Sequence, residues 1–123
     1  MPYELQVKIH PEYVYFKRTG TAVYSEVLEF WAKVIQVCNE HGIKKVLAET
    51  VNEIYLPAKE VFDVATRFQE LSADYGFRIA HVFTGTEPES LGGRFGESVL
   101  RKRGANYRKF DDIESAKEWL LSD

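Results

Sequence analysis

A glycine-rich segment, TGTEPESLGGRFGES at residues 84–98, is the stretch whose residue types come nearest to a phosphate-binding loop. The backbone N–H groups of such a loop can cradle a phosphate, but a P-loop also needs a lysine and a hydroxyl residue after its second conserved glycine. That pair is absent here, and so is the dinucleotide fingerprint G-x-G-x-x-G. We therefore expect no nucleotide cofactor.

The same segment can also be interpreted as a helix start packed closely against a sheet. Glycines let a backbone approach its neighbours, and Pro88 favours a sharp entry into the helix. The free N–H groups of a helix start, together with Arg94, would also favour contact with an anion. We therefore assign part of a binding surface to Thr84, Thr86, Ser90, Gly92, Gly93 and Arg94.

A second set of polar residues lies at the end of a predicted strand, where open α/β sheets bind their ligands. These residues are Glu49, Thr50, Asn52 and Glu53, and they complete the predicted binding surface. The enzymatic alternative is a small hydrolase or transferase that uses Glu49, Glu53 or His81 beside the glycine-rich segment, and it predicts a deep pocket that holds these side chains.

Histidine and cysteine side chains give no catalytic or metal-binding pattern. His10, His41 and His81 have no two-ligand spacing, so we expect no metal site. His81 alternates with apolar residues in a predicted strand, which favours a semi-buried, hydrogen-bonded histidine over a catalyst. Cys38 is the single cysteine and lies on the apolar stripe of a predicted helix, where a thiol has low reactivity.

The elements that would position these residues follow from the hydrophobic periodicity. Residues 3–9 alternate apolar and polar, which predicts a strand with one buried face, and the run YVYFKRT should pair with it as an antiparallel hairpin. A helix should begin near Ser25 and end before Gly42. Phe30 and Val37 widen its apolar stripe. It is either wedged between the sheet and a neighbour, which we favour, or presents a contact surface.

The rest of the chain alternates strands and helices. We expect strands at residues 43–50, 77–83 and 106–110, and helices from Pro57 to Gly76, at residues 97–103 and after an N-cap at Asp111 or Asp112. The order β-β-α-β-α-β-α-β-α predicts a single α/β domain over residues 1–123. Its five-stranded sheet should be mixed and mainly parallel after an N-terminal antiparallel hairpin, with about four helices.

Composition excludes several classes of protein. No apolar run approaches the ~20 residues that a bilayer crossing needs, and the N-terminus lacks a secretory pattern, so we expect a cytoplasmic protein without a membrane span. Residues 94–109 hold six basic residues, but the chain has a net charge of −3 and no aromatic-basic recognition motif. We therefore expect no nucleic-acid partner.

The element order, the hairpin YELQVKIHPEYVYFKRTG and the ending FDDIESAKEWL together resemble the STAS fold of anti-sigma-factor antagonists, in particular their stand-alone small relatives. In that family a strand is followed by an aspartate-capped helix carrying A..WL. The resemblance covers nearly the whole chain and implies a regulatory domain that acts by protein association. It extends to CRAL-TRIO lipid-binding domains, which implies a lipid-like ligand as an alternative.

Two features bear on what the resemblance implies. Phosphorylatable STAS domains carry an Asp-Ser pair after the first central strand, whereas the corresponding region here, AETVNEIYLPAKE, has Thr50 and no serine. The phosphoserine switch is therefore not expected. Four phenylalanines either fill the interior, which we favour, or surround an apolar ligand. They are Phe30, Phe62, Phe68 and Phe95.

Taken together, these patterns predict a non-enzymatic domain that acts by protein association or by binding a small anionic or lipid-like ligand. Homodimerisation is a further hypothesis, because the broad apolar stripe at residues 27–38 and the hairpin residues Tyr13, Tyr15 and Phe16 could form a patch that a twofold dimer would cover.

Overall fold

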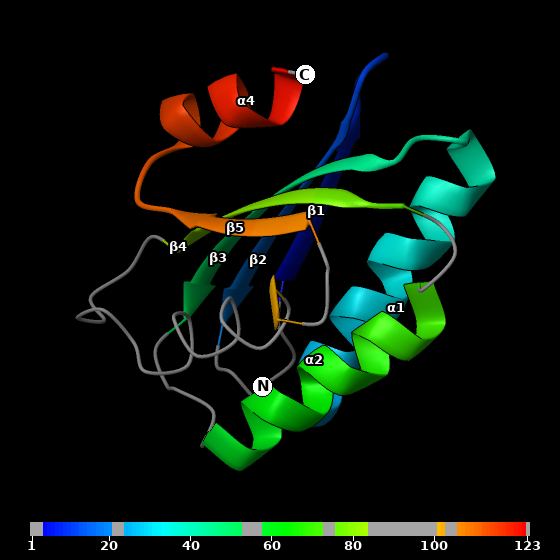
Figure 1. The fold of residues 1–123 in the computed structure, drawn as a ribbon, viewed down its shortest axis with the longest axis vertical. Coiled ribbons are helices and arrows are strands. Elements are labelled where there is room, and N and C mark those ends of the chain that lie inside the picture. The colour runs from blue at the N-terminus through cyan, green and yellow to red at the C-terminus, as the bar shows by residue number, and fades with distance from the viewer. Residues whose placement is uncertain are drawn as a thin grey trace.

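The computed structural model describes residues 4–20, 24–52, 58–72, 76–83, 101–102 and 106–122. Within these residues the protein is a five-stranded sheet with α1 and α2 on one face and α4 on the other (Figure 1). The elements are β1 (Glu4–Ile9), β2 (Val14–Gly20), α1 (Tyr24–His41), β3 (Lys45–Asn52), α2 (Ala58–Ser72), β4 (Arg78–Phe83), β5 (Asn106–Phe110) and α4 (Ile113–Leu121).

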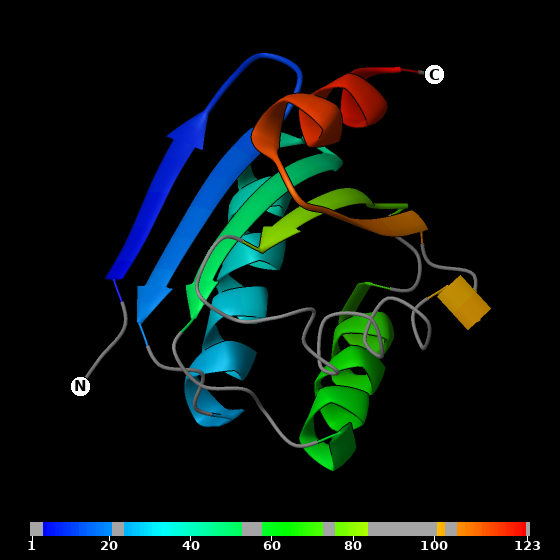
Figure 2. The same ribbon diagram turned by 90° about the vertical axis from the view of Figure 1, so that its left-hand side faces the viewer.

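The sheet has the strand order β1-β2-β3-β4-β5. β1 pairs with β2 in antiparallel orientation, and every later pair is parallel. This confirms the predicted mixed α/β sheet with its N-terminal hairpin. The chain crosses from β2 to β3 through α1 and from β3 to β4 through α2, in the same direction along the sheet. Two crossovers with the same handedness and direction place their helices on the same face, as Figures 1 and 2 show.

As predicted, Gly42 follows the end of α1 and Asp112 precedes the start of α4. Gly42 follows α1 with φ +66°, a left-handed conformation that favours glycine. Asp112 is the N-cap of α4, since its Oδ1 accepts a hydrogen bond of 2.8 Å from the backbone N–H of Ser115. The predicted strand 43–50 differs slightly, because β3 runs on to Asn52. None of the described helices is long and apolar enough to cross a lipid bilayer.

Two apolar layers hold the sheet between its helices. One layer lies under α1 and α2 and includes Phe16, Phe30, Val34, Ala48, Phe68 and Ile79. The other lies under α4 and includes Tyr13, Leu47, Ala80, Val82, Ala116 and Leu120. Phe30 and Val37 are buried, so α1 is indeed wedged between the sheet and its neighbour α2. The apolar patch suggested for a dimer is therefore mostly used inside the chain.

Arg78 of β4 contacts the end of α4. Its Nη2 donates hydrogen bonds to the carbonyl oxygen of Trp119 at 2.6 Å and to Oγ of Ser122 at 3.3 Å. Its guanidinium carbon lies 3.9 Å from the centroid of the Trp119 ring, within the range of a cation–π contact. The carbonyl groups at the end of α4 thereby gain a charged donor from the first residue of β4.

The prediction of one buried face for the first strand is wrong. Val7 is 37% exposed and Ile9 is 49% exposed, and Leu5 alone of the described apolar residues of β1 packs against the core. The reason is position, because β1 is an edge strand and α1 packs over β2 instead (Figure 2). Alternation in the sequence marks the two faces of a strand but does not say whether a helix covers either.

Phe62 is also placed differently from the prediction, which set it in the interior together with Phe68. Phe68 is 6% exposed whereas Phe62 is 45% exposed. Six residues at 3.6 residues per turn separate the two side chains by roughly 120° around the helix axis. Val64, one turn before Phe68, is the buried neighbour instead. Phe95 lies outside the described residues.

These two phenylalanines offer a matched test of the packing. Phe68→Ala should lower the free energy of unfolding by about 3–5 kcal/mol, because it removes a buried ring and leaves a cavity. Phe62→Ala should lower it by less than about 1 kcal/mol, because much of that ring stays in water in the folded protein. Urea denaturation followed by tryptophan fluorescence measures both values. Equal losses would contradict the placement of these side chains.

Candidate functional site

Five polar side chains gather at the carboxyl ends of the parallel strands, on the face that α1 and α2 cover. Arg18 lies opposite Thr50 in the β2–β3 register, and His81 lies opposite Lys109 in the β4–β5 register. Tyr107 precedes Lys109 by two residues, so it points to the same face. We call Arg18, Thr50, His81, Tyr107 and Lys109 the polar cluster.

His81 is the centre of the polar cluster. Its Nε2 lies 2.7 Å from Oγ1 of Thr50, and its Nδ1 hydrogen-bonds with the hydroxyl group of Tyr107. Trp31 of α1 packs edge-on against the imidazole, with 5.4 Å between ring centroids. The histidine therefore joins β3, β4 and β5 in one hydrogen-bond chain beneath a helix.

The surroundings of His81 keep its imidazole neutral. Burial is the largest cause, followed by the positive charges of Lys109 and Arg18, and together they lower the pKa of His81 from 6.5 to about 3. A neutral imidazole has one donor and one acceptor nitrogen, and the hydroxyl groups of Thr50 and Tyr107 can each serve either way. Both ring nitrogens are thus satisfied in either tautomer.

Two cations flank this neutral ring. Arg18 is only 1% exposed, which is rare for an arginine because moving its charge out of water is costly. The side chain of Lys109 is 11% exposed, and its Nζ lies 3.6 Å from Oδ1 of Asp111, whose side chain is 90% exposed. The carboxyl ends of the strands therefore carry buried positive charge next to groups that can donate hydrogen bonds.

The chain Thr50–His81–Tyr107 has the form of a nucleophile, a base and an orienting group. A general base works best when its pKa is near the working pH, whereas the pKa of His81 is about 3. Thr50 is also buried. The arrangement therefore gives little activation of the threonine hydroxyl, and it agrees with the prediction of a hydrogen-bonded structural histidine at position 81.

Glu49 lies on the opposite face of the sheet from the polar cluster. The hydroxyl group of Tyr15 donates a hydrogen bond of 2.5 Å to Oε1 of Glu49. Burial, and then this hydrogen bond and the carboxylate charge, raise the pKa of Tyr15 above its ordinary range. Because successive residues of a strand point to opposite faces, Glu49 and Thr50 cannot share one site. The predicted surface is therefore divided at this point.

The other predicted site residues are only partly placed. Asn52 ends β3 in backbone register with Gly20. The remaining members of the predicted surface lie outside the described residues, so their assignment stays a prediction: Glu53, Thr84, Thr86, Ser90, Gly92, Gly93 and Arg94. Arg18, Tyr107 and Lys109 were missed in the sequence. The available signal was their two-residue spacing, since Arg18 follows Phe16 and Lys109 follows Tyr107 at that spacing, but only the strand register shows that they meet.

Cys38 is a buried residue of α1, as its place on the apolar stripe predicted. Burial raises the pKa of its thiol to about 12, so the reactive thiolate is almost absent at neutral pH. Within the described residues, no group of three or more His, Cys, Asp and Glu side chains could hold a metal ion.

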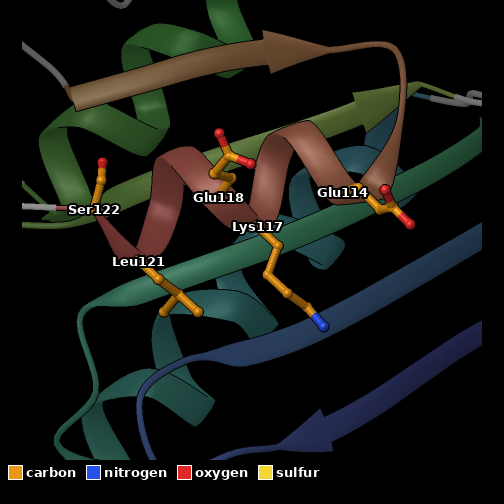
Figure 3. A pocket seen from close by; sticks show the side chains of 5 residues that line it. All are labelled: Glu114, Lys117, Glu118, Leu121 and Ser122. Atoms are coloured by element: carbon orange, nitrogen blue, oxygen red, sulfur yellow. The ribbon is translucent and has the colours of Figure 1, made fainter.

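A depression of about 430 Å³ lies along the exposed side of α4 (Figure 3). Its lining comes from one helix, and Glu118 and Lys117 point to different sides of it. The lining residues are Glu114, Lys117, Glu118, Leu121 and Ser122. An open, mostly apolar surface of this kind lacks the converging polar groups that fix a small ligand. The polar cluster is the stronger candidate site.

No protein-family model matches the sequence, and a search of curated proteins gave no significant match.

The depressed pKa of His81 makes the stability of the protein depend on pH. Below pH 6.5 the unfolded chain protonates this histidine while the folded protein does not, so folding stability should fall as the pH drops towards 3. The slope should reach about 1.4 kcal/mol per pH unit. Urea denaturation between pH 7.5 and pH 4.5 would measure it.

The matched variants are His81→Gln and His41→Gln. His81→Gln should flatten the dependence above pH 5, where few carboxylates titrate. His41 is exposed at the end of α1, so His41→Gln should leave the slope unchanged. The same slope in both variants would show that His81 is not the group held neutral.

Proposed function

We propose that this protein is a non-enzymatic binding domain that takes a small anionic group at the polar cluster. The observation that carries the proposal is a pair of cations, the buried Arg18 and the partly buried Lys109, on either side of Thr50 and His81 at the carboxyl ends of parallel strands. Ligands of open α/β sheets bind outside these strand ends.

Charge and hydrogen bonding both favour an anion there. The cations nearest His81 have the same sign, so a bound phosphate or carboxylate group would offset their repulsion inside the protein. The ion pair between Lys109 and Asp111 involves a largely exposed carboxylate and is therefore weak. A ligand anion can therefore compete with Asp111 for contact with Lys109.

The enzymatic alternative finds less support in the geometry. It predicts one pocket that holds Glu49, Glu53 and His81, whereas Glu49 and His81 lie on opposite faces of the sheet. Glu53 lies outside the described residues. The proposal includes the STAS-like assignment and a regulatory role in the cytoplasm, on the grounds of the element order and the sequence patterns that resemble that family.

Isothermal titration calorimetry with inorganic phosphate, phenyl phosphate and citrate tests the proposal. Lys109→Gln should weaken the binding of at least one of these anions about tenfold, because it removes one charge-assisted contact. Lys117→Gln makes the same change of net charge on α4, across the sheet, and should leave the affinity within about twofold.

A bound anion should also raise the pKa of His81, because it offsets the positive charges that help to lower this value. Absence of binding for all three anions would contradict the proposal. Equal weakening by Lys109→Gln and Lys117→Gln would contradict it as well, since binding would then depend only on net charge.

A further inference from the structure

β1 is an edge strand whose chemistry suits a second copy of itself. In the described part of the chain no strand pairs with its outer edge, so a row of backbone donors and acceptors faces outwards (Figure 2). Val7 and Ile9 are exposed on the α1 side of this strand, and Glu4, Gln6 and Lys8 are exposed on the α4 side. Both the edge and the apolar side of β1 are therefore available for contact.

We propose that two copies of this chain associate through β1, antiparallel and centred on Gln6, so that their two sheets become one continuous sheet. The twofold axis then stands perpendicular to the sheet, and residues directly opposite each other point to the same face. Opposite residues must consequently have the same parity along the strand. This restricts the pairing to registers centred on a residue.

Charge selects one register among these. Centring the pair on Gln6 places Glu4 opposite Lys8 of the other copy, twice per dimer, on the α4 side. Centring it on Val7 places Lys8 opposite Gln6 instead, and centring it on Leu5 places Glu4 opposite Gln6. Opposite charges directly across an antiparallel pair stabilise it. Only the Gln6 register uses both charges of β1.

The same register also covers exposed apolar surface. Leu5 lies opposite Val7 of the other copy, again twice, on the side where α1 flanks the sheet. Cross-strand pairs of apolar residues stabilise a sheet, and here they would remove the exposed part of Val7 from water. The charged pairs lie on one side of the new sheet and the apolar pairs on the other.

The opposite edge of the sheet, β5, does not share this complementarity. Its sequence NYRKF contains two basic residues and no acidic residue. Antiparallel self-pairing of β5 therefore gains no ion pair among the residues of the strand itself, and the registers centred on Arg108 or Lys109 place like charges opposite each other. The proposal accordingly selects β1 and not β5.

Pairing through β1 uses no side chain of the polar cluster. Antiparallel pairing points the carboxyl ends of β2 to β5 in opposite directions in the two copies. The two polar clusters then lie at opposite ends of the dimer. The tests of dimerisation and of anion binding are therefore independent of each other.

A charge-exchange experiment with the full chain tests the dimer. Sedimentation equilibrium over micromolar to millimolar concentrations should show a monomer–dimer equilibrium. Glu4→Lys and Lys8→Glu should each raise the dissociation constant about tenfold or more, because each places two like-charged pairs across the interface. The double variant Glu4→Lys/Lys8→Glu should restore the affinity to within about threefold, since it re-forms both ion pairs.

Glu118→Lys is the control, because it makes the same charge change on the exposed side of α4 and should leave the dimer unchanged. Gln6→Cys gives an independent readout. Residues directly opposite in an antiparallel pair have Cα atoms about 4.5–5.5 Å apart, so an intermolecular disulfide should form in this variant and not in Lys8→Cys. The buried Cys38 does not compete.

A monomer at every concentration, or single exchanges that leave the dissociation constant unchanged, would overturn the proposal. If an exchange variant fails to fold, the cross-link decides. A disulfide in Gln6→Cys alone supports the register, and no disulfide, or equal cross-linking of Gln6→Cys and Lys8→Cys, refutes it.

Discussion

The hydrogen-bond chain through His81 is the interaction on which the structure of the site depends. Thr50 and Tyr107 come from the strands on either side of β4, so both hydrogen bonds form only when β3, β4 and β5 are in register. Losing either partner would leave a buried polar group unsatisfied, at a cost of about 1–3 kcal/mol. The chain thus ties the position of three strands to the presence of one uncharged imidazole.

Burial affects both the protonation of His81 and the electrostatic field of the two cations beside it. Arg18, Thr50 and His81 are buried on the face under α1 and α2. Burial keeps the histidine uncharged and strengthens the field of Arg18 and Lys109, because a low local dielectric screens charge poorly. An imidazole with a pKa of about 3 is a weak base at neutral pH, and for this reason we propose anion binding and not catalysis at this site.

The sequence contained enough to place most elements but not to show which of them meet. Period-2 and period-3.6 patterns, Gly42 and Asp112 predicted the strands, the end of α1 and the start of α4, because these depend on local backbone chemistry. The polar cluster depends on strand register, which joins residues as far apart as Arg18 and Lys109. The alternation of residues in β1 predicted one buried face. The exposure of β1 follows from its position at the edge of the sheet, which depends on the whole topology. The sequence of a strand likewise does not indicate which of its faces a helix covers.

The most direct test of a neutral, doubly hydrogen-bonded His81 is ¹⁵N NMR of its imidazole ring through a pH titration, assigned by comparison with His81→Gln. The account predicts one protonated and one unprotonated ring nitrogen from pH 7.5 down to pH 5, with slow exchange of the ring N–H proton, because the pKa lies at about 3. Two protonated ring nitrogens at pH 5, with a midpoint near the ordinary histidine value of about 6.5, would contradict it.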